Sequence, residues 1–150
     1  MSAPVLAGVR DMIGRVPDPE IPVLTIEDLG VLRDVRQEGA ALIVEITPTY
    51  SGCPAMTQIA DDIAEVLEAA GVSNHEVRLV HYPAWTTDWI SAEAREKLLD
   101  YGISPPGGNR LCPNCRETNT RMVALFGSTA CKALVICESC GEPFDYFKEF

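Results

Sequence analysis

Four of the six cysteines form two C-x-x-C pairs in the last third of the sequence, a pattern suited to holding a metal ion. The pairs are Cys112/Cys115 and Cys137/Cys140, and 21 residues separate them. Two cysteines three positions apart can direct both sulfurs at one ion, and two such pairs complete a tetrahedral site of four sulfurs. Because four thiolates leave no open coordination position, we expect this site to be structural and not catalytic.

The identity of the ion stays open at this stage. Zinc is the first expectation, and iron is the alternative because four cysteines bind it in the same geometry. Two disulfides are the other alternative, which a reducing cytoplasm disfavours. Residues 120–126 and 133–136 are β-like and are expected to form the ribbon that carries the pairs. Cys131, between the pairs, is expected to be a small buried side chain, with a spare ligand or redox thiol as the alternative.

Cys53 is a candidate for thiol chemistry because it precedes Pro54 where a predicted strand gives way to a predicted helix. Proline suits the first turn of a helix, so Cys53 is expected at or near the N-cap. There the unpaired amides and the helix dipole would favour the thiolate, while a buried structural cysteine is the alternative. Asp18, followed by Pro19 and Glu20, is a second polar candidate, and turn formation is its alternative explanation.

The elements that must position these residues follow from the apolar periodicity. The pattern predicts helices over residues 5–16, 54–71 and 91–101, a hairpin of strands over 31–35 and 41–47, and a strand over 76–82. Strands with helices on one face predict an α/β (α+β) two-layer sandwich. The segment Ser104-Pro105-Pro106-Gly107-Gly108-Asn109 disfavours helix and strand, so we divide the chain into domains 1–104 and 105–150.

Composition and charge exclude several classes of protein. The 150 residues are 47% hydrophobic and 23% charged, as in an ordinary globular protein. The net charge is −10, with 7 basic and 17 acidic residues in 1–104 and 5 of each in 105–150. Such a surface repels phosphate backbones and anionic lipid, so we expect no nucleic-acid or membrane partner. The sequence shows neither a long apolar run nor a secretory signal, which predicts a cytoplasmic protein.

Three motifs in residues 1 to about 104 resemble the MIP18-like, SufT-like family linked to iron–sulfur cluster assembly. They are Asp18-Pro19-Glu20-Ile21-Pro22, Glu27-Asp28-Leu29-Gly30 and Thr47-Pro48-Thr49-Tyr50-Ser51-Gly52-Cys53-Pro54. Together with the tail segments 126–133 and 142–148, they make the whole chain resemble the PaaD-type (PaaJ-type) family of the phenylacetyl-CoA epoxidase system.

This resemblance implies a MIP18-like domain followed by a zinc-ribbon-like module. It also implies an accessory maturation protein in aerobic phenylacetate degradation, which assists assembly of an iron or iron–sulfur centre. Cys53 and Asp18 would handle metal or sulfur transiently, and zinc or an iron–sulfur cluster would be the cofactor. The implied partners are epoxidase components, especially the iron–sulfur flavin reductase, and a homodimer is kept beside a monomer.

Two other functions stay open. The chain could be a non-catalytic structural subunit of the epoxidase complex, or a small redox enzyme that uses Cys53 and Cys131. It lacks the E-x-x-H pairs of a di-iron carboxylate site, so the resemblance does not imply that it performs the epoxidation itself.

Overall fold

The computed structural model describes residues 1–50 and 53–149, which form two compact units, Met1–Trp85 and Thr86–Phe150. The first unit contains α1 (Ala3–Gly14), α2 (Ile26–Leu29), β1 (Leu32–Glu38), β2 (Ala41–Ile46), α3 (Ala55–Ala69) and β3 (His75–Leu79). The second contains a 3₁₀ turn (Thr87–Trp89), α4 (Ala92–Asp100), β4 (Ile103–Ser104), β5 (Thr120–Ala124), β6 (Lys132–Cys137) and β7 (Pro143–Phe147). Our domain boundary after residue 104 stays a prediction, because compactness alone does not define a domain.

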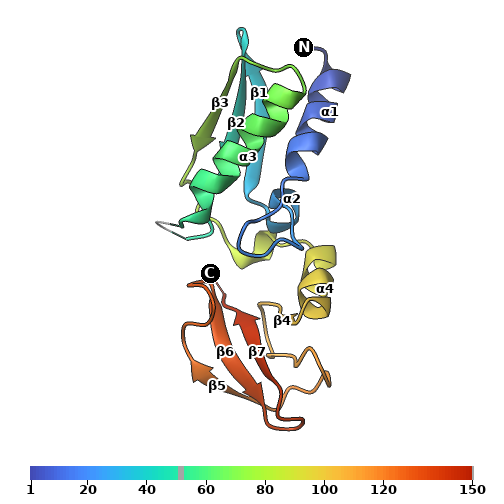
Figure 1. Ribbon diagram of the computed structural model, residues 1–150, viewed down its shortest axis with the longest axis vertical. Helices are drawn as coiled ribbons and strands as arrows, with labels where there is room; N and C mark the ends of the chain where they lie inside the picture. Colours follow the sequence, from blue (N-terminus) through green and yellow to red (C-terminus); the bar gives the residue numbers. More distant parts are fainter. Residues whose placement is uncertain (51–52, 150) are drawn as a thin grey trace. The chain divides into compact units, whose positions relative to one another are not determined.

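The first unit is a two-layer sandwich, as the sequence predicts. Its sheet has the order β1-β2-β3, in which β1 and β2 form an antiparallel hairpin and β2 and β3 run parallel. Helix α3 crosses one face of the sheet with α1 beside it (Figure 1). Parallel neighbours need a crossover connection, and α3 supplies it between β2 and β3. The segment that leaves β2 and enters α3 therefore lies at the carboxyl end of the sheet.

Spacing along α3 explains why this helix forms and which face it buries. Met56, Ile59, Ile63 and Leu67 recur every three or four residues, and all four are buried. They pack over the inner face of the sheet, where Val44 is fully buried. Burial of such side chains contributes about 1.5–3 kcal/mol each relative to exposure, so this apolar stripe fixes α3 on the sheet.

The outer face of the sheet is covered by charge instead of by helices. Arg36 of β1 forms ion pairs with Asp34, Glu38 and Glu45, the last across the strand pair on β2. The carboxylates raise the pKa of Arg36 above its ordinary value, with the hydrogen bond to Glu45 as the largest cause. Ile43 beneath this network is 2% exposed, so the charged side chains shield an apolar floor from water.

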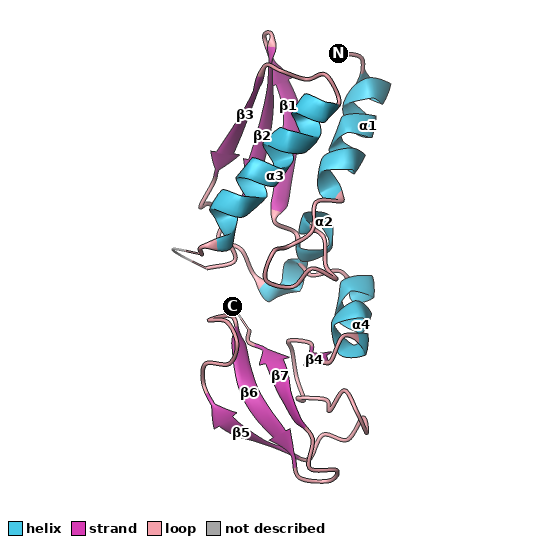
Figure 2. Cartoon of the chain, in the orientation of Figure 1, coloured by secondary structure: helices cyan, strands magenta, loops and turns pink. Residues whose placement is uncertain are grey.

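The second unit is built on a sheet of order β4-β7-β6-β5 (Figure 2). Strands β5, β6 and β7 form an antiparallel ribbon, and β4 adds to β7 in parallel. The expected ribbon strands are present, but β7 was not predicted. Strand β4 corrects the sequence analysis, because Ser104 pairs with Tyr146 although it begins the segment expected to lack strand structure. Within the described residues, no helix has the length and apolar character that crossing a bilayer requires.

Candidate functional site

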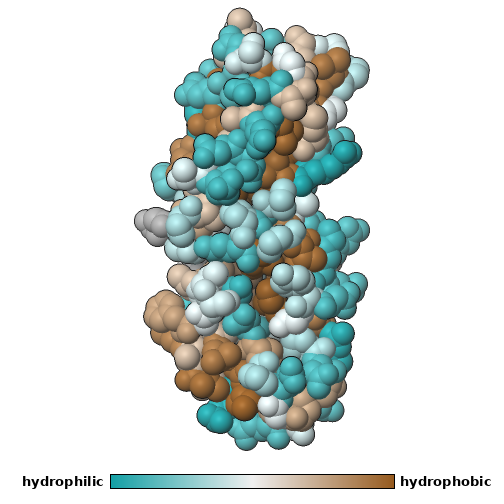
Figure 3. All heavy atoms as spheres, viewed as in Figure 1, coloured by the Kyte–Doolittle hydropathy of each residue, from teal (hydrophilic) through white to brown (hydrophobic). Residues whose placement is uncertain are grey.

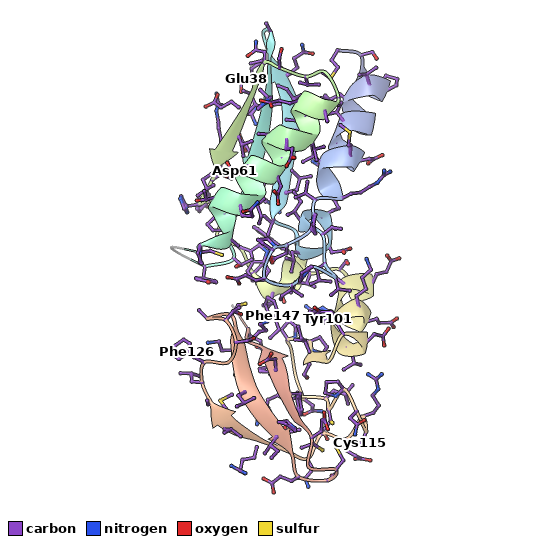
Figure 4. The ribbon with its side chains drawn as sticks, in the orientation of Figure 1. Glu38, Asp61, Tyr101, Cys115, Phe126 and Phe147 are labelled. Carbon is purple, nitrogen blue, oxygen red and sulfur yellow. The ribbon has the colours of Figure 1, made fainter. Side chains whose placement is uncertain are left out.

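The two C-x-x-C pairs come together at one end of the ribbon. Cys112 and Cys115 lie in the loop before β5, while Cys137 ends β6 and Cys140 lies in the turn before β7. Their four sulfur atoms all lie within 4.8 Å of one another. Figure 4 labels Cys115 at this end, where the sulfurs of the ribbon gather. The structure therefore brings together all four of the predicted ligands.

The distances between the sulfurs test whether a metal ion fits. Cys112 Sγ lies 3.7 Å from Cys140 Sγ, and Cys115 Sγ lies 3.6 Å from Cys137 Sγ. A tetrahedral ion with metal–sulfur bonds of about 2.3 Å requires sulfurs about 3.8 Å apart. A disulfide requires about 2.05 Å, and all four cysteines are free. The cage fits a tetrahedral metal ion and excludes the alternative of two disulfides.

Both pairs are held by the same turn. The backbone N–H of Cys115 donates to Cys112 Sγ at 3.5 Å, and that of Cys140 donates to Cys137 Sγ at 3.4 Å. In each turn the next residue is left-handed, with φ of 67° at Arg116 and 82° at Gly141. These donors stabilise negative charge on sulfur, as the spacing predicts, and the left-handed residue lets the chain leave the turn.

The protonation of the cage shows why four sulfurs need a cation. A hydrogen bond from the backbone of Glu117 lowers the pKa of the Cys115 thiol, but burial and the other three sulfurs outweigh it and raise that pKa to about 12. The pKa of Cys140 falls to about 7, because the backbone of Glu142 and the side chain of Asn114 donate to its sulfur. Four adjacent thiols do not ionise together unless a bound cation displaces their protons.

The cage is also part of the hydrophobic core of the ribbon. Cys112 and Cys137 are fully buried and pack in one cluster with Ala133, Val135 and two aromatic residues of β7. In a segment with so small a core, a bound ion would contribute directly to folding free energy. The geometry, the burial and the electrostatics together identify a metal-binding site.

Cys53 is half-buried at the junction of β2 and α3. Its backbone N–H donates to the Tyr50 carbonyl at 3.2 Å, and its carbonyl accepts from Met56 N–H at 3.4 Å. Pro54 is the N-cap of α3, so Cys53 lies one position before the cap, close to the predicted place. Thr49 Oγ1 lies 4.0 Å from the sulfur. Ser51 and Gly52 of the predicted motif lie outside the described residues.

The electrostatics of Cys53 differ from the sequence expectation. Burial raises the pKa of this thiol, and the negative charge of Glu20 raises it further. Hydrogen bonds from the backbone of Ala55 and the side chains of Thr49 and Tyr50 lower it, yet the net direction is upward. The expectation that the helix end would favour thiolate is therefore wrong, because desolvation outweighs the dipole at this half-buried position.

Asp18 and Glu20 lie in the loop that joins α1 to α2. Asp18 is 8% exposed, and its carboxylate accepts from the backbone N–H of Glu20 at 3.3 Å, as in an Asx turn. A hydrogen bond from Asp18 N–H to the Leu24 carbonyl closes the loop. Glu20 is the acid whose charge acts on Cys53, and sequence reasoning selected only Asp18. No local signal could have found Glu20, because the tertiary fold alone brings the two segments together.

Two other candidates have packing roles. Cys131 is 4% exposed, and its sulfur lies 3.0 Å from Thr129 Oγ1, which agrees with a small buried side chain. Trp85 is 5% exposed, and its Nε1 donates to the Leu29 carbonyl at 2.8 Å. Core packing of Trp85, preferred to ligand stacking in the sequence analysis, is confirmed.

Comparison with known proteins finds counterparts for both modules. The family of the PaaD zinc beta ribbon domain matches residues 107–148, and the iron–sulfur cluster assembly protein family matches residues 6–78. The chain is 46% identical over 157 residues to the "Putative 1,2-phenylacetyl-CoA epoxidase" component of type D from Escherichia coli, with 99% of this chain and 95% of that protein covered.

Two further comparisons concern the first unit. The chain is 35% identical to the Fe-S protein maturation auxiliary factor SufT of Staphylococcus aureus, over 55% of this chain and 96% of that protein. The crystal structure of a domain of unknown function, DUF59, from Bacillus anthracis matches with a TM-score of 0.56 and 30% identity, over 62% of this chain and 90% of that one. The resemblance inferred from the motifs is confirmed for both parts of the chain.

Proposed function

The chain belongs to the PaaD-type family of 1,2-phenylacetyl-CoA epoxidase proteins, and from this we propose that it is an accessory protein of a phenylacetyl-CoA epoxidase system that assists assembly of an iron–sulfur or iron centre. One observation carries the proposal. The similarity to the Escherichia coli relative spans 99% of this chain, and so includes the assembly-type unit and the ribbon together.

We assign the handling of the cargo to Cys53. Its raised pKa keeps the thiol protonated near neutral pH, which limits its oxidation while it is idle. When iron or a cluster is delivered, a metal–sulfur bond forms, the S–H bond breaks and the proton leaves to solvent. The acidic loop of Asp18 and Glu20 supplies negative charge beside this sulfur, which favours a metal cation over an anionic ligand.

We assign zinc to the four-cysteine cage. Four thiolates at tetrahedral spacing form a closed structural site of the kind that zinc prefers, and the ribbon then serves as a docking module. When bound, the ion holds the two turns together and stabilises the ribbon. Elemental analysis tests this assignment, because about one equivalent of zinc supports it and iron in place of zinc contradicts it.

The proposed client is the iron–sulfur flavin reductase of the epoxidase system. Both proteins would meet in the cytoplasm, where the reducing environment suits six free cysteines. The docking would be transient, since a maturation factor leaves once the centre is complete.

Replacement of Cys53 by serine tests the proposed mechanism in cells that lack the wild-type protein. We expect the reductase to lose most of its cluster, measured as iron and acid-labile sulfide per chain after purification. Cys131→Ser is the matched control, because it also removes one thiol but leaves the loop between β2 and α3 unchanged. Full cluster content with Cys53→Ser would contradict a role for this sulfur.

A stable structural subunit is the second candidate, and the name of the Escherichia coli relative, which is that of an epoxidase component, favours it. Co-purification separates the two functions. Stoichiometric retention of the protein on the mature epoxidase supports a subunit, whereas release after maturation supports an accessory factor.

A further inference from the structure

Strand β5 exposes an apolar surface at the edge of the ribbon sheet. It pairs with β6 on one side, and no strand among the described residues pairs with its other side. Four large apolar residues, on the strand and just after it, form what we call the β5 patch: Met122, Val123, Leu125 and Phe126, with exposed fractions of 37%, 51%, 59% and 65%. Figure 3 shows hydrophobic side chains gathered over β5 at the lower left, and Figure 4 shows Phe126 projecting outward.

The backbone of β5 indicates what kind of structure the patch can bind. The carbonyl of Asn119 accepts from Glu138 N–H at 2.8 Å and so points toward the β6 side. Backbone groups alternate in direction along an antiparallel strand, so Thr120 and Met122 direct their N–H and C=O groups away from β6. An open edge of this kind is completed by another extended strand, which satisfies these groups while it covers the apolar side chains.

The charges around the patch favour a neutral strand as its partner. Arg121 is the one ionisable residue in 120–126, and its Nε lies 3.4 Å from the carboxylate of Glu138. The Lys148 ammonium donates to the Leu125 carbonyl at 3.0 Å and lies 4.1 Å from the ring centre of Phe126. Both cations are therefore engaged by their own chain, and neither selects an acidic partner.

We propose that the β5 patch binds the β5 patch of a second copy of this chain, with the two strands antiparallel about a two-fold axis. A two-fold interface requires a surface that is complementary to itself. With Met122 opposite Met122, Arg121 lies opposite Val123 and no like charges meet. A shift that places Thr120 opposite Met122 would bring the two Arg121 side chains together, which is unfavourable.

The distribution of charge along the chain agrees with this mode of association. Unit Met1–Trp85 carries 5 basic and 13 acidic residues, a net charge of −8, whereas Thr86–Phe150 carries 7 and 9, a net charge of −2. Two copies therefore repel each other least when they approach through the second unit. The ribbon edge is both the apolar and the least charged route to a dimer.

Sedimentation equilibrium of the full-length, metal-loaded protein tests this proposal between about 1 μM and about 1 mM, the range expected for so small an interface. We expect the average mass to rise toward twice the monomer mass with concentration. Met122→Lys and Met122→Glu should each weaken dimerisation by about tenfold or more, because like charges then face each other. An equimolar mixture of the two variants should restore the dimer, because opposite charges meet.

Leu79→Lys is the matched control, since Leu79 is 46% exposed but lies on β3 in the first unit, and it should leave dimerisation unchanged. Metal content and circular dichroism verify that the variants fold, and Phe126→Ser replaces any Met122 variant that loses its metal. The proposal is overturned if the wild-type protein stays monomeric throughout, or if the two Met122 variants dimerise like the wild type. Binding of the β5 patch to an epoxidase component by a monomeric wild-type protein would also overturn it.

Discussion

Replacement of Gly141 by alanine adds one methyl group to the second metal-binding turn at a position with φ of 82°. A Cβ atom there meets no other atom within 4 Å, so the substitution introduces backbone strain without a steric clash. A left-handed residue with a Cβ costs roughly 1–2 kcal/mol. Because the binding energy of a structural metal is also folding energy, this cost should appear as a metal affinity weaker by about 5- to 30-fold.

The assay is competition for the metal between the protein and a chelator of known affinity, followed through the chelator's absorbance. Gly8→Ala is the control, because Gly8 lies within α1 and an added Cβ there also meets nothing within 4 Å. Arg116→Gly changes the equivalent position of the first turn in the opposite direction, and its affinity should not fall. The reasoning is refuted if Gly141→Ala retains wild-type affinity, or if Gly8→Ala weakens binding equally.

Three further predictions concern the thiol, the metal and the core. Alkylation of Cys53, followed by mass spectrometry of its peptide, should have a pH midpoint above the ordinary cysteine value, and Glu20→Gln should move it to lower pH because a negative charge that raises the pKa is removed; an upward or absent shift would contradict this. Removal of the metal by a chelator should abolish protection of amides in β5, β6 and β7 against hydrogen exchange while those of β2 keep theirs, and persistent protection of the ribbon would show that it folds unaided. Ile63→Ala should lower the free energy of unfolding by about 2–5 kcal/mol in a denaturant titration, whereas Val5→Ala, at a position 52% exposed, should change it little; equal effects would disprove the assignment of α3 to the core.

The sequence predicts the features whose cause is local. The periodicity of α3 identifies its buried face, and the C-x-x-C spacing identifies both metal-binding turns, because each depends on residues within a few positions of one another. Thr25 is a similar case, since its side chain accepts from Asp28 N–H and Asp28 accepts in return, the capping box that the motif predicts. Such features need no tertiary contact to be recognised.

The features that sequence reasoning missed depend on distant segments. Strand β7 begins at a proline and spans five residues, so its pairing with β6 decides its structure more than its composition does. The charge of Glu20 acts on Cys53 through the fold, and no spacing rule connects positions so far apart. The raised pKa of Cys53 has the same origin, because burial depends on packing while the helix dipole is visible in the sequence.

The separation of the two metal-binding turns along the chain has a consequence for biosynthesis. The sulfurs of Cys115 and Cys137 belong to residues 22 positions apart, and those of Cys112 and Cys140 to residues 28 apart. While the ribosome extends the intervening segment, the nascent chain offers only the first two sulfurs, a half-site that holds an ion weakly. Once the second turn is synthesised, closing the loop costs chain entropy that the two new metal–sulfur bonds must exceed. Capture of the ion therefore occurs in two stages, and the second stage makes it tight.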